Sequence, residues 1–267
     1  MTGNNVIEVK DLRIRYKTVQ AESIKKSLFS FRKSKLEEFE AVKGISFSIE
    51  KGEVVGLIGK NGSGKSTTLR SIAGIFSADE GSIDIGDNSI SLLSIGVGFN
   101  KELTGKDNIY LSGLLLGFTE QQIKEKYKEI VKFSELGKFI NSPVRTYSSG
   151  MYSKLAFSIT AIMETDIILI DEVLSVGDIK FKKKSLKKIK ELISDSDRTV
   201  MIVSHSTATI AKLCTRVIWI HEGELRMDGP TEEVLAAYQE FMDETEPEKK
   251  KTKKEKSEEK LLKYLDD

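Results

Sequence analysis

The sequence has very few of the residues that carry disulfide or zinc chemistry. Among 267 residues there is one cysteine, Cys214, and there are two histidines. A single cysteine cannot form an internal disulfide, and no cysteine pair is present for a zinc knuckle. A disulfide-stapled fold is therefore excluded, and a reducing cytosol is the compartment that fits best.

A charge excess and long apolar runs are also missing. Lys and Arg total 42 against 41 Asp and Glu, giving a formal net charge of +1, which disfavours a protein built to coat nucleic acid. The N-terminus has no hydrophobic signal core. The most apolar stretch, residues 109–118, is shorter than the roughly 18 residues of a membrane span. We expect a chain that does not cross a membrane by itself.

Apolar, strand-like runs alternate with helical patterns along most of the chain. Hydrophobic residues make up 39% of the sequence, enough for one large domain or a domain with a subdomain. Helical patterns cover residues 66–75, 103–165 and 179–193. The strand-like runs are residues 7–9, 12–16, 42–49, 53–58, 80–83, 90–93, 167–170, 199–203, 217–220 and 224–227. This alternation predicts an α/β fold with a mostly parallel sheet and helices on both faces, and the last two runs are expected to end the folded part as a hairpin.

Two segments have unusual charge patterns. In residues 17–40, Ile24, Leu28 and Phe31 fall at helical spacing, flanked by basic side chains. These are Lys25, Lys26, Arg32, Lys33 and Lys35. We expect a basic amphipathic helix there, which either lies against anionic lipid or a partner helix or packs on its own domain. Residues 244–267, in which 16 of 24 are charged, predict a solvated tail. The seven lysines of residues 179–193 are interpreted as a solvated helix face.

The strongest motif lies between an apolar strand and a helix. Residues 59–66 match G-x-x-x-x-G-K-[ST], the pattern of a loop whose backbone N–H groups wrap a phosphate. Its members are Gly59, Lys60, Asn61, Gly62, Ser63, Gly64, Lys65 and Ser66. Lys65 is expected to reach the β- and γ-phosphates of a nucleotide and Ser66 to ligate Mg²⁺.

Two further strands end in residues that suit nucleotide chemistry. A strand over residues 167–170 leads into Asp171 and Glu172, and residues 199–203 lead into His205. Many strands end in acids, but the carboxyl edge of an α/β sheet is where such folds bind ligands. Asp171 is therefore a candidate for the Mg²⁺ shell, Glu172 for polarising a water, and His205 for sensing a γ-phosphate.

With these motifs in order, the sequence resembles the ABC ATPases. Residues 147–151, Tyr-Ser-Ser-Gly-Met, take the place of the signature motif, usually Leu-Ser-Gly-Gly-Gln, and residues 175–178 match the D-loop. Within this family, the polysaccharide-exporting branch is the one whose motifs look most like the amino-acid sequences of residues 98–109, 133–137, 147–151 and 171–178. Within it, teichoic acid export is favoured over O-antigen or capsule export by the 17–40 insertion and by a short charged tail where many O-antigen subunits carry a glycan-binding domain.

The resemblance implies a fold and a set of roles. The fold would be a P-loop NTPase core with an antiparallel β subdomain and a helical subdomain over about residues 103–165, together occupying residues 1–243. Tyr16 would stack on adenine, although an ordinary strand tyrosine is the alternative. Thr67 would join the phosphate site, and Asn100, in place of the usual Q-loop glutamine, would contact Mg²⁺ and water. Ser148 and Gly150 would close on the nucleotide of a second copy, and Asp178 would lie at that site.

The resemblance also implies cofactors and partners. ATP and Mg²⁺ would bind, and ATP would be hydrolysed to power export of a lipid-linked polysaccharide. A separate integral membrane permease and a second copy of this chain, in a head-to-tail ATP sandwich, would be required on the cytoplasmic face of the membrane. A soluble ABC ATPase acting on ribosomes or DNA is the alternative, but no second nucleotide domain or long coiled coil is found. No Asn-Lys-x-Asp motif supports a GTPase.

Overall fold

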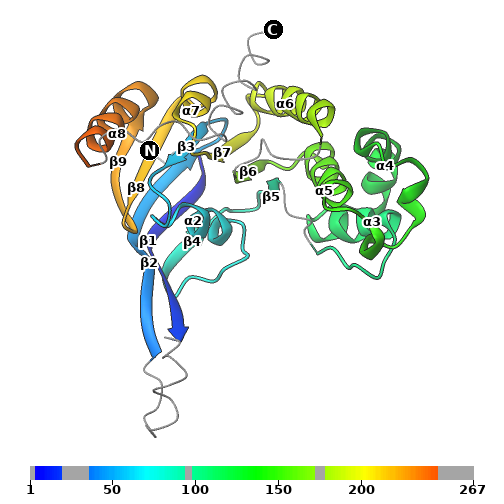
Figure 1. Ribbon diagram of the computed structural model, residues 1–267, viewed down its shortest axis with the longest axis horizontal. Coiled ribbons are helices and arrows are strands. Elements are labelled where there is room, and N and C mark those ends of the chain that lie inside the picture. The colour runs from blue at the N-terminus through cyan, green and yellow to red at the C-terminus, as the bar shows by residue number, and fades with distance from the viewer. Residues whose placement is uncertain (1–3, 20–35, 94–97, 172–177, 246–267) are drawn as a thin grey trace, which may run out of the picture.

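The computed structural model describes residues 4–19, 36–93, 98–171 and 178–245, and it has two parts (Figure 1). One part contains two β-sheets, and the other is a group of helices at the right of the view. The prediction of an α/β fold with an antiparallel sheet and a separate helical region is confirmed.

The larger sheet has six strands in the order β5-β6-β7-β3-β8-β9. Its strands are β3 (Val54–Ile58), β5 (Ile90–Leu93), β6 (Ile167–Asp171), β7 (Thr199–Val203), β8 (Arg216–His221) and β9 (Glu224–Pro230). All neighbours are parallel except β8 and β9, which form the predicted hairpin. In the register, Val203 pairs with both Leu57 and Asp171, so the carboxyl ends of β3, β6 and β7 meet at one edge.

The smaller sheet is antiparallel, in the order β2-β1-β4. It consists of β1 (Asn5–Val19), β2 (Leu36–Glu50) and β4 (Glu80–Asp84). The two short runs expected in residues 7–16 are one strand with register shifts, and Asp11 adopts a φ of 46° there. Strand β2 begins at Leu36 rather than near residue 41, and Val19 pairs with Leu36. Residues 17–19 and 36–40 are therefore strand, and a helix over the whole of 17–40 is wrong.

The centre of the expected basic helix, with Ile24, Leu28, Phe31 and the five basic residues, lies outside the described residues. The structure does describe the paired ends of β1 and β2 on either side of this segment, residues 17–19 and 36–38. The backbone hydrogen bonds supplied by a partner strand outweigh the weak local preference of these charged segments.

The helical part confirms the pattern seen over residues 103–165. It contains α3 (Gly105–Leu115), α4 (Glu120–Ser134), α5 (Ser149–Met163) and the 3₁₀ turns η1 (Gly137–Asn141) and η2 (Val144–Thr146). Thr104 and Thr119 begin α3 and α4 with reciprocal capping boxes, which satisfy backbone N–H groups at the helix starts. Ile109, Ile123 and Ile159 belong to a separate core under these helices.

The two faces of the large sheet are covered differently. Val55 and Leu57 of β3 belong to a core shared with the antiparallel sheet and α2 (Lys65–Ile72), whereas Val54 and Ile58 face a core shared with helices. Those helices are α5, α6 (Ile179–Ile193), α7 (Thr207–Leu213) and α8 (Thr231–Thr245). The expectation of helices on both faces is confirmed, but on one face the antiparallel sheet packs beside α2.

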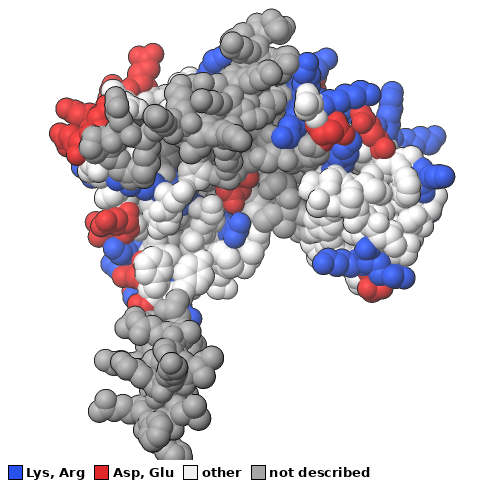
Figure 2. All heavy atoms as spheres, in the orientation of Figure 1, with Lys and Arg blue, Asp and Glu red and all other residues white. Residues whose placement is uncertain are grey.

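Helix α6 buries one apolar stripe, which includes Phe181, Leu186 and Ile189. Its lysines are exposed or half-buried, and Figure 2 shows basic side chains gathered around α6. Lys184 and Lys188 pair with Glu135 and Glu164, so the interpretation as a solvated face holds only for part of the helix. Helix α8 is absent from the prediction, which ended the folded part at the β8–β9 hairpin. Its described part ends at Thr245, so the predicted domain boundary at residue 243 stays a prediction. Within the described ranges, no helix has the length and apolar character needed to cross a bilayer.

Candidate functional site

The loop of residues 59–66 joins β3 to α2, as predicted, and is called the phosphate loop below. Gly59, Gly62 and Gly64 have φ values of 149°, 78° and 100°, which L side chains rarely adopt. A Cβ on Gly59 would collide with the carbonyl oxygen of Ile220, and one on Gly64 would lie 2.5 Å from that of Ala41. Glycine is required at both positions because the neighbouring backbones leave no room.

Lys65 and Ser63 point their polar atoms into this loop. Lys65 is only 4% exposed, and its Nζ donates to the carbonyl oxygens of Gly59 at 2.8 Å and Lys60 at 2.7 Å. The buried Oγ of Ser63 has no hydrogen-bond partner among the described residues. An unpartnered buried hydroxyl next to an ammonium group and a ring of glycines fits a phosphate.

Ser66 and Asp171, 105 residues apart, meet at the carboxyl edge of the sheet. The Ser66 hydroxyl donates to Oδ1 of Asp171 at 3.1 Å, and Nη2 of Arg70 lies 3.5 Å from Oδ2. A hydroxyl and a carboxylate are the hard oxygen ligands that Mg²⁺ accepts in phosphate sites, where it keeps few protein ligands. The pair therefore fits the predicted metal position. Arg70 was not anticipated from the sequence.

The other predicted nucleotide residues are placed less completely. The Tyr16 hydroxyl shares a hydrogen bond of 3.2 Å with Oγ1 of Thr67, so Tyr16 does lie beside the phosphate loop. His205 is exposed, two residues after β7, at the same edge of the sheet as Asp171. Glu172, predicted to be the general base, lies outside the described residues.

Asn100 is held at the start of the helical part. Its side-chain oxygen accepts a hydrogen bond of 3.0 Å from the backbone N–H of Glu102. Its backbone N–H donates to the side-chain oxygen of Asn108, and its backbone carbonyl accepts from the side-chain amide of the same residue. These contacts make Asn100 part of the turn that leads into α3. Its role toward Mg²⁺ and water stays a prediction.

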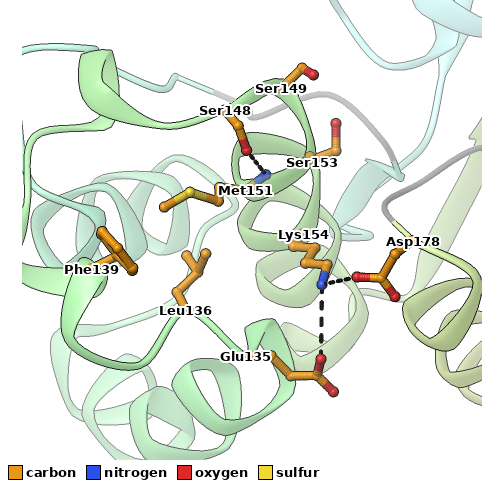
Figure 3. Close-up of a pocket in the computed structure, with 10 residues that line it drawn as sticks. Glu135, Leu136, Phe139, Ser148, Ser149, Met151, Ser153, Lys154 and Asp178 are labelled. Carbon is orange, nitrogen blue, oxygen red and sulfur yellow. Dashed lines mark hydrogen bonds and ion pairs between the residues drawn. The ribbon is translucent and has the colours of Figure 1, made fainter.

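The signature residues line a separate cavity of about 650 Å³ on α5. Ser148 precedes α5 as its N-cap and accepts a hydrogen bond of 3.2 Å from the N–H of Met151, and a Cβ on Gly150 would lie 3.9 Å from the Ser148 hydroxyl oxygen. Figure 3 shows these residues with Lys154, Glu135 and Asp178 around the cavity. None of the residues that line this cavity belongs to the phosphate loop.

Lys154, one turn beyond the signature, links three elements and was missed from the sequence. Its Nζ lies 2.6 Å from Oδ2 of Asp178 and 3.9 Å from Oε2 of Glu135 (Figure 3). Oδ1 of Asp178 accepts the N–H of Phe181 and caps α6. Asp178 is thus held by its own chain, and its predicted place at the nucleotide of a second copy stays a prediction. The signal that the sequence offers is that Lys154 follows Gly150 of the signature by four residues, which is one helical turn.

This pairing predicts a pH dependence of stability. The hydrogen bond from Lys154, followed by that from the Phe181 N–H, lowers the pKa of Asp178 from its ordinary value of 3.8 to about 2. Because the folded pKa lies below the unfolded one, the stabilisation is present above about pH 4 and is lost as the pH falls toward 2. Denaturant unfolding of wild type and Asp178→Asn should therefore differ at pH 6 and converge near pH 2. A difference that is constant with pH would contradict this pairing.

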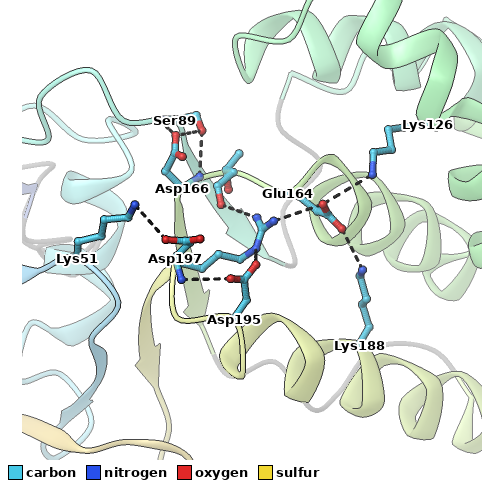
Figure 4. Close-up of polar contacts among 10 residues, drawn as sticks. Lys51, Ser89, Lys126, Glu164, Asp166, Lys188, Asp195 and Asp197 are labelled. Carbon is cyan, nitrogen blue, oxygen red and sulfur yellow. Dashed lines mark hydrogen bonds and ion pairs between the residues drawn. The ribbon is translucent and has the colours of Figure 1, made fainter.

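A second polar cluster fixes the far end of α5 (Figure 4). Glu164, which ends α5 in the left-handed conformation, lies within 4 Å of Lys126, Lys188 and Arg198. Arg198 also donates to the carbonyl oxygen of Thr165, just before β6. The signature helix is thus tied at both ends to the part that carries the sheet.

Comparison with known proteins agrees with this geometry. The fold and the loop define a P-loop nucleotide-binding protein. A family model described as ABC transporter matches residues 42–175. RfbB, an O-antigen export ATP-binding protein of Klebsiella pneumoniae, is 43% identical over 80% of this chain and 86% of its own length. This chain belongs to the ABC transporter family.

Relatives named for teichoic acid export are equally similar. TagH proteins, teichoic acids export ATP-binding proteins, are 44% identical in Enterococcus faecalis over 84% of this chain and 38% identical in Bacillus cereus over 98%. The matched part is 51% and 47% of their lengths, so this chain spans about half of each. Resemblance to polysaccharide-export ATPases is therefore confirmed.

Solved structures agree on the fold. The ATP-binding cassette MJ0796, in a dimeric post-hydrolysis state bound to ADP and Pi, superposes with a TM-score of 0.64 at 22% identity, covering 84% of this chain and 98% of that one. An ATP-binding subunit of an ABC transporter superposes with a TM-score of 0.67 at 20% identity, covering 88% and 93%.

Proposed function

We propose that this chain is the ATP-hydrolysing subunit that powers export of a lipid-linked cell-wall or surface polysaccharide, with teichoic acid favoured. The observation that carries the proposal is the meeting of Ser66 and Asp171 beside the glycine-lined phosphate loop. The chain's similarity to export ATP-binding proteins supports the transport role. A separate integral membrane subunit would provide the path, with this chain on the cytoplasmic face.

The described residues suggest how MgATP is held. Lys65 would exchange the carbonyl oxygens of Gly59 and Lys60 for phosphate oxygens, and Ser63 would donate its unpartnered hydroxyl. Ser66 and Asp171 would hold Mg²⁺, which offsets phosphate charge when bound. Glu172 would then accept a proton from the attacking water, and His205 would contact the γ-phosphate. ATP would do work by favouring a closed over an open state.

A second copy of this chain would complete each site. The residues that line the signature cavity do not include the phosphate loop, which is consistent with each copy providing one half of a shared site. The MJ0796 cassette, which shares this fold, is described as dimeric, and this supports a dimer here. Ser148 and Gly150 of one copy would then close on the nucleotide that Lys65 of the other copy holds.

Mixed dimers test this arrangement. One copy with Ser148→Arg is combined with one copy with Lys65→Ala. In a head-to-tail dimer both lesions fall on one composite site and the other stays intact, so about half of the nucleotide crosslinking should survive. Dimers with both changes in each copy are the control and should lose both sites. Equal damage at the two sites would contradict the sandwich.

The identity of the polymer is proposed on narrower grounds. The similarity to TagH of Bacillus cereus extends over 98% of this chain, which supports teichoic acid. RfbB of Klebsiella pneumoniae matches over most of its own length, so an O-antigen or capsule polymer is the alternative. The charged tail does not distinguish teichoic acid from O-antigen export. The RfbB protein of Myxococcus xanthus and the TagH proteins both extend well beyond the part of their sequences that matches this chain. A soluble, non-transport ABC ATPase is the less favoured alternative.

Reconstitution tests the function directly. The full chain is co-expressed with candidate permeases and assembled in vesicles, and ATP turnover is measured with lipid-linked teichoic acid, O-antigen or neither. We expect association with a permease and the largest stimulation by teichoic acid, since the transported molecule shifts the open–closed equilibrium. Stimulation by O-antigen alone would reassign the polymer. Turnover without any permease association would favour the soluble alternative.

A further inference from the structure

Helix α8 reaches the phosphate loop from the far end of the chain. Nζ of Lys60, the second residue of the loop, donates to Oγ1 of Thr245 at 3.0 Å, across 185 residues. The same Nζ lies over the ring of Phe241, 5.1 Å from its centroid. Both partners belong to the last turn of α8, where the helix dipole also favours a cation.

Phe241 is held in place by several other groups. The guanidinium of Arg226, on β9, lies 4.1 Å from the centroid of its ring, and the rings of His221 and Trp219, on β8, lie 4.8 and 5.3 Å away. An aromatic face attracts cations, and closely packed neighbouring rings restrict its motion. The ring of Phe241 is therefore a fixed platform for the Lys60 side chain.

The backbone of Lys60 is at the same time part of the binding machinery. Its carbonyl oxygen accepts the Lys65 Nζ at 2.7 Å and the Ser63 N–H at 3.2 Å. Whatever restrains the Lys60 side chain therefore restrains the carbonyl that positions Lys65. The loop is supported from the same side by Gly223, in the β8–β9 turn, whose N–H donates to the Ser63 carbonyl at 3.1 Å.

We propose that Phe241 of α8 is a positioning residue for the phosphate loop, acting through the side chain of Lys60. By holding Lys60, it reduces the conformational freedom that the loop loses when nucleotide binds, and so raises nucleotide affinity. This inference rests on the proposed ATP binding and goes beyond it, because it makes the C-terminal helix part of the nucleotide site. A change in α8 would thereby be transmitted to Lys65.

Binding of the non-hydrolysable analogue AMP-PNP with Mg²⁺ to the full-length chain tests the proposal. Phe241→Leu, which keeps apolar bulk but removes the π-face, is expected to raise Kd roughly threefold to tenfold. Lys60→Met, which also removes the bond to Thr245, should have an effect at least as large, and the double variant should be no worse than Lys60→Met alone, because both changes remove the contact between Lys60 and Phe241. Phe241→Tyr retains the ring and should bind like wild type.

Tyr238→Leu is the matched control. Tyr238 lies one turn earlier on α8, and its ring contacts Trp219 at 5.2 Å. Loss of the Tyr238 ring should lower the unfolding midpoint as much as Phe241→Leu does, yet leave the Kd for AMP-PNP unchanged. Trp219 is the only tryptophan, so its fluorescence provides a second readout: a nucleotide-induced change seen in wild type should shrink in Phe241→Leu.

The outcomes separate the two claims. If Phe241→Leu binds the analogue as tightly as wild type, or if the effects of the two single variants simply add, the positioning role is overturned while the proposed function stands. If the wild-type chain binds no analogue, the proposed function fails and this inference fails with it.

Discussion

Glu172→Gln should bind MgATP with nearly wild-type affinity while its turnover falls by roughly 10²- to 10⁴-fold, the usual contribution of a general base. The amide has the shape of the carboxylate but cannot accept the proton of the attacking water. The residues proposed to hold the nucleotide, Lys65, Ser66 and Asp171, remain unchanged in this variant. Single-turnover phosphate release together with equilibrium binding separates the chemical step from affinity.

Glu224→Gln is the control for this substitution. Glu224 is an exposed acid on β9, so the same change of charge there should leave turnover unaltered. The slow variant should also accumulate as an ATP-bound dimer, visible by size-exclusion chromatography. Turnover of Glu172→Gln within about threefold of wild type would remove Glu172 from the role of general base.

Gly64→Ala should abolish most nucleotide binding. A non-glycine residue at a φ of 100° is strained by about 1–3 kcal/mol, and its Cβ would lie 2.5 Å from the carbonyl oxygen of Ala41. Either the loop or β2 must move, and Gly64 directly precedes Lys65 and Ser66. A loss near 3 kcal/mol corresponds to a Kd for MgATP raised about 100-fold. Calorimetry with the purified chain measures the change.

Gly74→Ala is a control that has the backbone strain of a positive φ but no collision of the new Cβ with a neighbouring atom. Gly74 follows α2 with a φ of 72°, and no heavy atom lies within 4 Å of the Cβ that it would gain. This control should lose about 1–2 kcal/mol of stability because of the left-handed backbone, without a change in Kd. If Gly64→Ala and Gly74→Ala bound MgATP equally well, the close approach of Ala41 would not matter for the loop.

Most of the elements of this chain could be predicted because their patterns are local. The apolar runs that became β3, β6 and β7, and the amphipathic α6, follow from periodicity alone. Helix α8 was missed although Val234, Tyr238 and Phe241 fall at helical spacing, because the charged tail that follows masks the pattern. The strand at residues 36–40 was missed because its stability comes from pairing with β1 and not from its own charged sequence.

The candidate site divides in the same way. Spacing along the chain was enough to identify the phosphate loop, the acid at the end of β6 and, through resemblance, the polysaccharide-export branch of the ABC family. The contacts of Ser66 with Asp171, of Lys154 with Asp178 and of Lys60 with Thr245 and Phe241 required the folded chain. Periodicity and motif spacing report the conformation of neighbouring residues, whereas residues 24 to 185 positions apart meet only where sheet register and helix packing bring them together.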